Sequence, residues 1–133
     1  MPNRVVHFEI QVDNVERAIK FYKDVFGWQI DKWQSPGMEY WMVMTAEQGS
    51  KENGISGGLL KRQSPITKQE QGANSFVSTI DVKNFDETAK KILEAGGSVA
   101  VPKSSIPQMA WIGYFIDTEG NTFGVFQEDK NAE

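Results

Sequence analysis

The 133-residue sequence predicts an α+β fold made of two βαβββ modules in tandem. In each half, short runs of apolar and polar residues typical of strands surround a single apolar stripe at helical spacing. The two halves also repeat one another. Sliding one half along the other so that Asn14 meets Asn84 also pairs Gly27 with Gly97 and Trp41 with Trp111. An α+β domain whose halves merely share a common motif is the alternative to this duplication.

The first predicted strand ends at Val12 and has two chemically different faces. Its polar face carries His7, Glu9 and Gln11, and His7 is the only histidine in the chain. Its apolar face consists of Val6, Phe8, Ile10 and Val12. This alternation predicts a strand with one face in a core and one face able to do acid–base or hydrogen-bond chemistry.

A helix is predicted directly after this strand. Asp13 or Asn14 is suited to cap its first turn, and Gly27 stands where a left-handed helix end is expected. Its apolar stripe is formed by Val15, Ala18, Ile19, Tyr22, Val25 and Phe26. Three strands are then predicted over 28–33, 39–46 and 55–62.

The second half repeats this order. A strand over 76–82 precedes a helix capped by Asn84, with Glu87 in the capping-box position. Gly96 and Gly97 end the helix, and strands follow over 98–103, 109–116 and 121–128. The predicted buried stripe of this helix is Phe85, Ala89, Ile92 and Leu93.

These elements predict one domain over 1–133. The first module covers about 4–62, a polar linker 63–74, and the second module about 75–128.

Composition narrows the function classes. The net charge of −4 argues against nucleic-acid binding, which favours a basic surface. No apolar run approaches the length of a membrane helix, and no signal-peptide pattern is present. The absence of cysteine excludes disulfides and thiolate metal sites. We therefore expect a cytoplasmic protein that acts on neither nucleic acid nor membrane.

The sequence resembles the vicinal oxygen chelate superfamily, which includes glyoxalase I, bleomycin-resistance proteins and extradiol dioxygenases. The resemblance is carried by the opening His7-x-x-Ile10-x-Val12-Asp13, by the helix ERAIKFYKDVFGW, and by the closing segment DTEGNTFGVFQ. It covers almost the whole chain. It implies two curled mixed sheets that enclose a cleft, with the helices outside, and it implies a homodimer.

Metal-dependent members of that family bind one divalent cation with four strand residues. The resemblance places His7, Val77, Leu60 and Gln127 in these positions. A valine and a leucine supply no donor atom, so at most His7, Glu9 and Gln127 remain as ligands. We therefore expect no tightly bound metal and no other cofactor, with a divalent metal as the alternative.

The remaining function is the binding of a small organic ligand. We expect His7 and Glu9 to act as ligand-binding or acid–base residues, and the alternative is a histidine retained after loss of a metal. Trp41 and Trp111 either wall the ligand site or fill the cores of their sheets. Thr79 and Gln127 complete the candidate ligand-binding residues.

Two other functions stay open at this point. One is a metal-dependent lyase or isomerase of the glyoxalase type. The other is a non-catalytic interaction subunit with a vestigial cleft.

Overall fold

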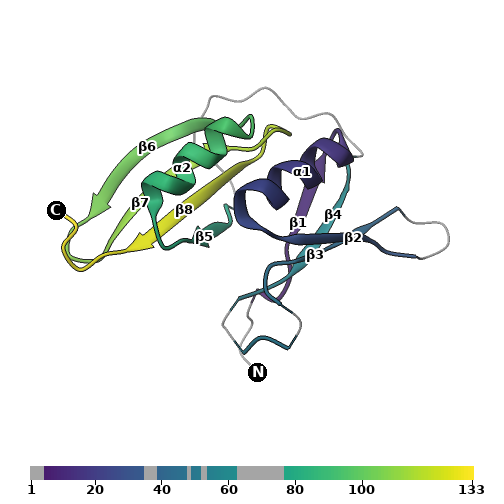
Figure 1. Ribbon diagram of the computed structural model, residues 1–133, viewed down its shortest axis with the longest axis horizontal. Helices are drawn as coiled ribbons and strands as arrows, with labels where there is room; N and C mark the ends of the chain where they lie inside the picture. Colours follow the sequence, from purple (N-terminus) through teal and green to yellow (C-terminus); the bar gives the residue numbers. More distant parts are fainter. Residues whose placement is uncertain (1–4, 35–38, 48, 52–53, 63–76) are drawn as a thin grey trace. The chain divides into compact units, whose positions relative to one another are not determined.

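The computed structural model describes residues 5–34, 39–47, 49–51, 54–62 and 77–133. It has two helices and two four-stranded mixed sheets, in the predicted α+β class (Figure 1). The chain divides into two compact units, Met1–Pro65 and Ile66–Glu133, and each contains one βαβββ module. The predicted linker 63–74 lies outside the described residues, and the single-domain organisation stays a prediction.

The first unit contains β1 (Glu9–Val12), α1 (Val15–Phe26), β2 (Gln29–Lys32), β3 (Trp41–Met44) and β4 (Gly57–Lys61). Its strands lie in the order β1-β4-β3-β2. The β1–β4 pair is parallel, whereas β3 pairs with both neighbours in antiparallel orientation. The helix α1 is the crossover between β1 and the rest of the sheet and runs across one face of it (Figure 1).

The ends of α1 follow from the sequence signals. The Asn14 side chain accepts a hydrogen bond from the Arg17 backbone N–H at 3.0 Å, which satisfies a donor of the first turn. At the other end, Gly27 has φ 72° and donates to the Lys23 carbonyl, as a left-handed cap does. The buried residues of α1 are Ala18, Phe21, Tyr22 and Val25, so Phe21 joins the predicted stripe.

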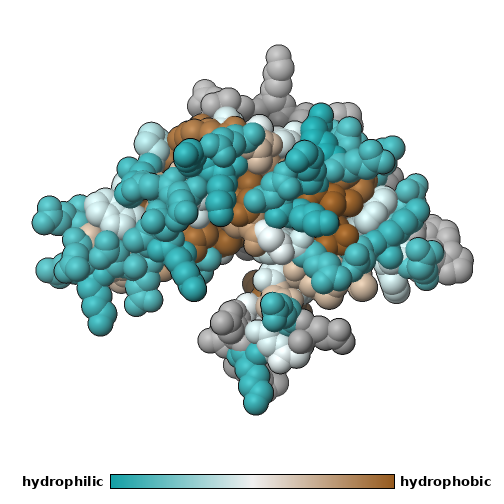
Figure 2. Space-filling view, viewed as in Figure 1, coloured by the Kyte–Doolittle hydropathy of each residue, from teal (hydrophilic) through white to brown (hydrophobic). Residues whose placement is uncertain are grey.

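The core of the first unit lies between α1 and its sheet. Val12, Ala18, Val43 and Leu59 are each 0% exposed. Phe8, Ile10 and Trp28 pack around this cluster. The apolar residues of the first strand therefore face the helix, except Val6, which is 76% exposed. Figure 2 shows hydrophilic residues over the outward faces of both helices.

The second unit contains β5 (Thr79–Asp81), α2 (Phe85–Glu94), β6 (Ser98–Ile106), β7 (Ala110–Ile116) and β8 (Thr122–Glu128). Its strand order β5-β8-β7-β6 repeats that of the first sheet, with a parallel β5–β8 pair. Asn84 caps α2 by accepting from the Glu87 backbone N–H at 3.0 Å. The internal repeat read from the sequence is therefore present in the structure.

Several details differ from the sequence prediction, among them the exposure of Leu93 and the length of β6. Leu93 was predicted to be buried, but it is 51% exposed, because it follows Ile92 by about 100° around the helix and leaves the buried face. β6 continues to Ile106, three residues further than predicted, because it pairs with β7 up to Ala110. Register shifts on either side of Val101 accommodate Pro102 on this edge strand.

Neither described helix is long and apolar enough to cross a membrane.

Candidate functional site

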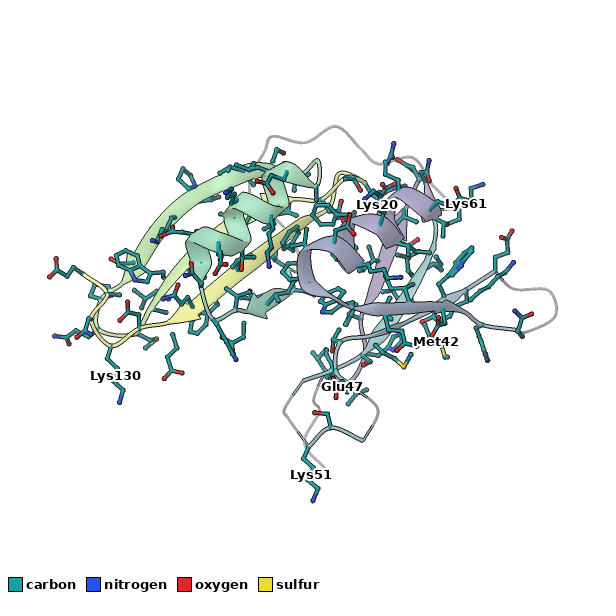
Figure 3. All side chains as sticks on the ribbon, viewed as in Figure 1. Lys20, Met42, Glu47, Lys51, Lys61 and Lys130 are labelled. Carbon is teal, nitrogen blue, oxygen red and sulfur yellow. The ribbon has the colours of Figure 1, made fainter. Side chains whose placement is uncertain are left out.

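The register of the first sheet separates its two faces. Glu9 lies opposite Gly58, and Gly58 lies opposite Met42, so these three residues share one face. Ile10, Leu59 and Trp41 are paired in the same way on the other face, which α1 covers. Figure 3 shows Met42 on the side of the sheet away from α1. The polar residues of the first strand therefore lie on the face that α1 leaves uncovered.

Three side chains meet on this uncovered face, and we call them the His7 cluster: His7, Glu9 and Tyr40. The Nε2 atom of His7 lies 2.9 Å from the Tyr40 hydroxyl and 3.8 Å from Oε2 of Glu9. The charge of Glu9 also acts on the Tyr40 hydroxyl. The side chains of His7 and Glu9 are 50% and 46% exposed, so both remain accessible to a ligand. The predicted pair His7 and Glu9 is therefore brought together, with Tyr40 as a third member.

A glycine makes room for Tyr40. A Cβ atom added to Gly58 would lie 1.7 Å from the Tyr40 hydroxyl oxygen and 2.0 Å from Cζ. The tyrosine hydroxyl thus occupies the space that a side chain at position 58 would need. Because Gly58 also pairs with Glu9, this contact holds the phenol beside the carboxylate.

Burial and the neighbouring carboxylate both act on the Tyr40 hydroxyl. Burial is the larger cause that raises the pKa of Tyr40, and the charge of Glu9 and its hydrogen bond add to it. The phenol therefore keeps its proton at neutral pH and serves as a hydrogen-bond donor rather than as a base.

An exposed tryptophan extends this site. The Trp33 ring packs edge-on against Tyr40, with ring centroids 5.9 Å apart at 74°, and Trp33 is 45% exposed. Met42 is 41% exposed on the same face as Glu9. These apolar groups lie beside the polar cluster, an arrangement typical of small-molecule sites.

Sequence reasoning missed Tyr40, Gly58, Trp33 and Met42 as site residues. The available signal was the alternation in EYWMVM, which puts Tyr40 and Met42 on one face and Trp41 and Val43 on the other. Choosing the correct face also required the β3–β4 register.

Trp41 does not join the His7 cluster. It is partly buried and packs against the core on the α1 side, and the ammonium group of Lys32 lies 5.7 Å from its ring centroid. Of the two roles left open for Trp41, the structure favours core packing.

In the second unit, Thr79 lies on the sheet face that α2 leaves uncovered. It pairs with Gly124, which pairs with Tyr114. The Thr79 hydroxyl is 2.9 Å from the position of a Cβ at Gly124, and the Tyr114 ring approaches to 3.3 Å. Thr79 and Gly124 thus repeat the pairing of Glu9 with Gly58, and Tyr114 takes the register position that Met42 has in the first unit.

Gln127 and Trp111 have structural partners in the second unit. They pair with one another, and Oε1 of Gln127 accepts a hydrogen bond of 2.6 Å from the Phe85 backbone N–H at the start of α2. The Trp111 indole donates to Oδ2 of Asp129 at 2.9 Å. Hydrogen bonds from the Asn131 backbone and from Trp111 lower the pKa of Asp129. Gln127 thus acts as a helix cap here.

The Trp111 ring also has a cation above it. The Lys103 ammonium lies 4.5 Å from the centroid of the Trp111 ring and forms a 3.0 Å ion pair with Asp86. The indole is therefore held on two sides by groups of its own unit.

The structure places the oxygen atoms of Glu9 and Tyr40 beside His7. Within the described part of the chain, no group of three or more His, Asp or Glu side chains is arranged to hold a metal ion. Glycines stand beside Glu9 in β4 and beside Thr79 in β8, and a glycine supplies no side-chain donor. The Oε1 atom of Gln127 is engaged by the Phe85 N–H. A borderline or hard cation prefers more donors than His7 and Glu9 provide.

Comparison with known proteins agrees with this fold. Residues 4–125 match the family described as Glyoxalase/Bleomycin resistance protein/Dioxygenase superfamily. A "Glyoxylase-like domain-containing protein" from Didymella fabae is 30% identical over 120 residues, covering 88% of each chain.

Solved structures share the fold at low identity. A glyoxylase/bleomycin resistance protein/dioxygenase domain from Frankia sp. EAN1pec has a TM-score of 0.70 at 15% identity, covering 98% of this chain and 95% of that one. The fosfomycin resistance protein FosX from Listeria monocytogenes has a TM-score of 0.69 at 14% identity, covering 97% and 96%. The family match over most of the sequence and the tandem βαβββ modules lead to one conclusion: this chain belongs to the glyoxalase/bleomycin resistance protein/dioxygenase superfamily.

Proposed function

We propose that this protein binds a small organic molecule at the His7 cluster without a resident metal ion. The observation that carries the proposal is the grouping of His7, Tyr40 and Glu9 on the sheet face opposite α1, with side chains of His7 and Glu9 about half exposed. An imidazole, a phenol and a carboxylate within hydrogen-bond reach form a concentrated set of polar groups.

The apolar surroundings suit a ligand with both a polar and an apolar part. The polar part meets the His7 cluster, and the apolar part rests on Trp33 and Met42, which are 45% and 41% exposed. An exposed indole and thioether beside fixed polar groups favour an amphipathic or aromatic molecule.

Family relatives support a small-molecule role without specifying the ligand. The relatives include a fosfomycin resistance protein, a glyoxalase I from Zea mays and a glyoxalase-related enzyme from Fulvimarina pelagi. The proposal differs from a metal-dependent glyoxalase because two of the four positions that the family resemblance assigns to metal ligands hold Val77 and Leu60, which have no donor atoms. A homodimer and a cytoplasmic location remain part of the proposal.

The lone histidine provides the test. In tag-free protein, the imidazole C–H signals in a proton NMR spectrum come from His7 alone. Fragments of aromatic amines, alcohols and carboxylic acids are added one at a time. We expect at least one to shift the His7 signals while the Trp111 indole N–H, held by Asp129, stays in place.

Trp33→Phe should weaken that binding, whereas the matched change Trp111→Phe should leave it intact. A fragment that shifts only the Trp111 signals, or none that moves His7, contradicts the proposal.

A further inference from the structure

The hydroxyl group of Tyr40 has two polar neighbours and one proton. Its oxygen lies 2.9 Å from Nε2 of His7, and the carboxylate of Glu9 acts on the same hydroxyl. A carboxylate only accepts hydrogen bonds, whereas an imidazole nitrogen either donates or accepts according to its tautomer. The arrangement that suits both neighbours directs the phenol hydrogen toward Glu9 and has His7 donating to the phenol oxygen.

The electrostatics select the same arrangement. Oε2 of Glu9 is 3.8 Å from the same Nε2 atom, so a hydrogen on that nitrogen points toward a negative charge. A lone pair on Nε2 would instead face the carboxylate. Both contacts therefore favour the tautomer with hydrogen on Nε2, which leaves Nδ1 as the acceptor atom of His7.

We infer that Tyr40 is a positioning residue that orders a hydrogen-bond chain from His7 through Tyr40 to Glu9, leaving Nδ1 of His7 as an acceptor for ligands that donate an N–H or O–H. The part of this inference that concerns the ligand rests on the proposed function. The part that concerns the hydrogen-bond chain rests on the geometry of the His7 cluster. Among the residues that the structure describes, the contacts of His7 involve Nε2, and its side chain is 50% exposed.

The hydrogen-bond chain also predicts which polar groups a ligand should carry. The cluster then presents an imidazole lone pair and a carboxylate, which are both acceptors. Met42 and Gly58, the residues next in line to Glu9 across the sheet, carry no charge. An alcohol or amine therefore meets complementary groups, whereas a carboxylate or phosphonate meets like charge.

The tautomer is measured directly in the ligand-free protein. A long-range proton–nitrogen correlation spectrum of tag-free, nitrogen-15-labelled protein at about pH 8, where an ordinary imidazole is neutral, reports which nitrogen carries the hydrogen. We expect hydrogen on Nε2 in a larger fraction than in the urea-unfolded chain. Tyr40→Phe should return the fraction toward the unfolded value.

Trp33→Phe is the matched control, because it changes an aromatic ring that touches Tyr40 without removing the hydroxyl. It should leave the tautomer unchanged. Hydrogen mainly on Nδ1, or a tautomer fraction that Tyr40→Phe does not alter, overturns the hydrogen-bond chain.

Ligand preference is tested with benzyl alcohol, benzylamine and benzoate, which share one ring and differ in the polar group. We expect the alcohol and the amine to shift the His7 nitrogen signals at lower concentration than benzoate. Tighter binding of benzoate overturns the donor-ligand inference. If none of the three compounds binds but the tautomer is as expected, the hydrogen-bond chain stands. The donor-ligand inference is then overturned, and the result counts against the proposed function.

Discussion

Two adjacent glycines in β4, Gly57 and Gly58, should be destabilised by alanine to different extents. A Cβ at Gly58 meets the end of the Tyr40 side chain, whose hydroxyl lies 1.7 Å away. A Cβ at Gly57 meets the backbone carbonyl oxygen of Phe8 at 2.2 Å and its ring at 2.8 Å. A side chain can rotate away, but a backbone carbonyl within a sheet cannot move alone.

The magnitudes follow from these contacts. In Gly58→Ala, the Tyr40 hydroxyl retreats by about 1.3 Å to reach the 3.0 Å below which Cβ contacts essentially do not occur. Crowding costs about 1–3 kcal/mol, and the gain of alanine over glycine in a strand offsets about 0.5–1 kcal/mol. We expect a net loss of about 1 kcal/mol in the free energy of unfolding, together with loss of the His7–Tyr40 hydrogen bond.

Gly57→Ala should cost more, about 3 kcal/mol or above. The Phe8 carbonyl accepts the 3.0 Å hydrogen bond from the Gly58 N–H that extends the β1–β4 pair, and displacing it leaves polar groups unsatisfied. Urea unfolding measures the stability of both variants, and the His7 imidazole signals measure the site. Equal destabilisation by the two substitutions, or an unchanged His7 spectrum in Gly58→Ala, would refute this reasoning.

Three further predictions concern the candidate site. The absorbance difference between wild type and Tyr40→Phe should give a phenol titration above the ordinary pKa of about 10, and Glu9→Gln should lower it. Because the pKa of Tyr40 is raised in the folded protein, its contribution to the free energy of unfolding is present below the ordinary pKa and is lost as pH rises through the raised value. Unfolding curves measured at alkaline pH check this sign. Gln127→Leu should lower the free energy of unfolding by about 1 kcal/mol, because the Phe85 N–H loses its acceptor. The shifts that fragments cause at His7 should stay unchanged. Weaker fragment binding would instead make Gln127 a ligand residue. Dialysis against EDTA should leave the thermal midpoint unchanged, whereas elemental analysis that finds a stoichiometric metal, lost in His7→Ala, would contradict the metal-free proposal.

The helices could be predicted from the sequence because their signals are local. Asn14 and Gly27 act within one turn of the helix that they begin or end, and the apolar period of 3.6 residues is visible along the chain. The repeat of these signals in the second half was sufficient to predict two βαβββ modules. Leu93 shows the limit, because an apolar residue at the edge of a stripe is not assigned to core or solvent by periodicity alone.

Part of the site was equally visible. His7 and Glu9 are two residues apart on a strand, so they necessarily share a face, and the apolar residues between them had to face a core. Amino-acid order was therefore enough to predict this polar pair. It also showed that two of the four expected metal-ligand positions, Val77 and Leu60, carry no donor atom.

Tertiary structure decided which residues join that pair. Tyr40 is 33 positions from His7 and reaches it only because β4, with Gly58, lies between their strands. From Tyr40 to Met44 both faces of the strand carry apolar or aromatic residues, so alternation alone does not reveal whether Tyr40 or Trp41 faces α1. Strand register made that choice, and the packing of α1 against Leu59 and Val43 placed Trp41 in the core and Tyr40 in the His7 cluster.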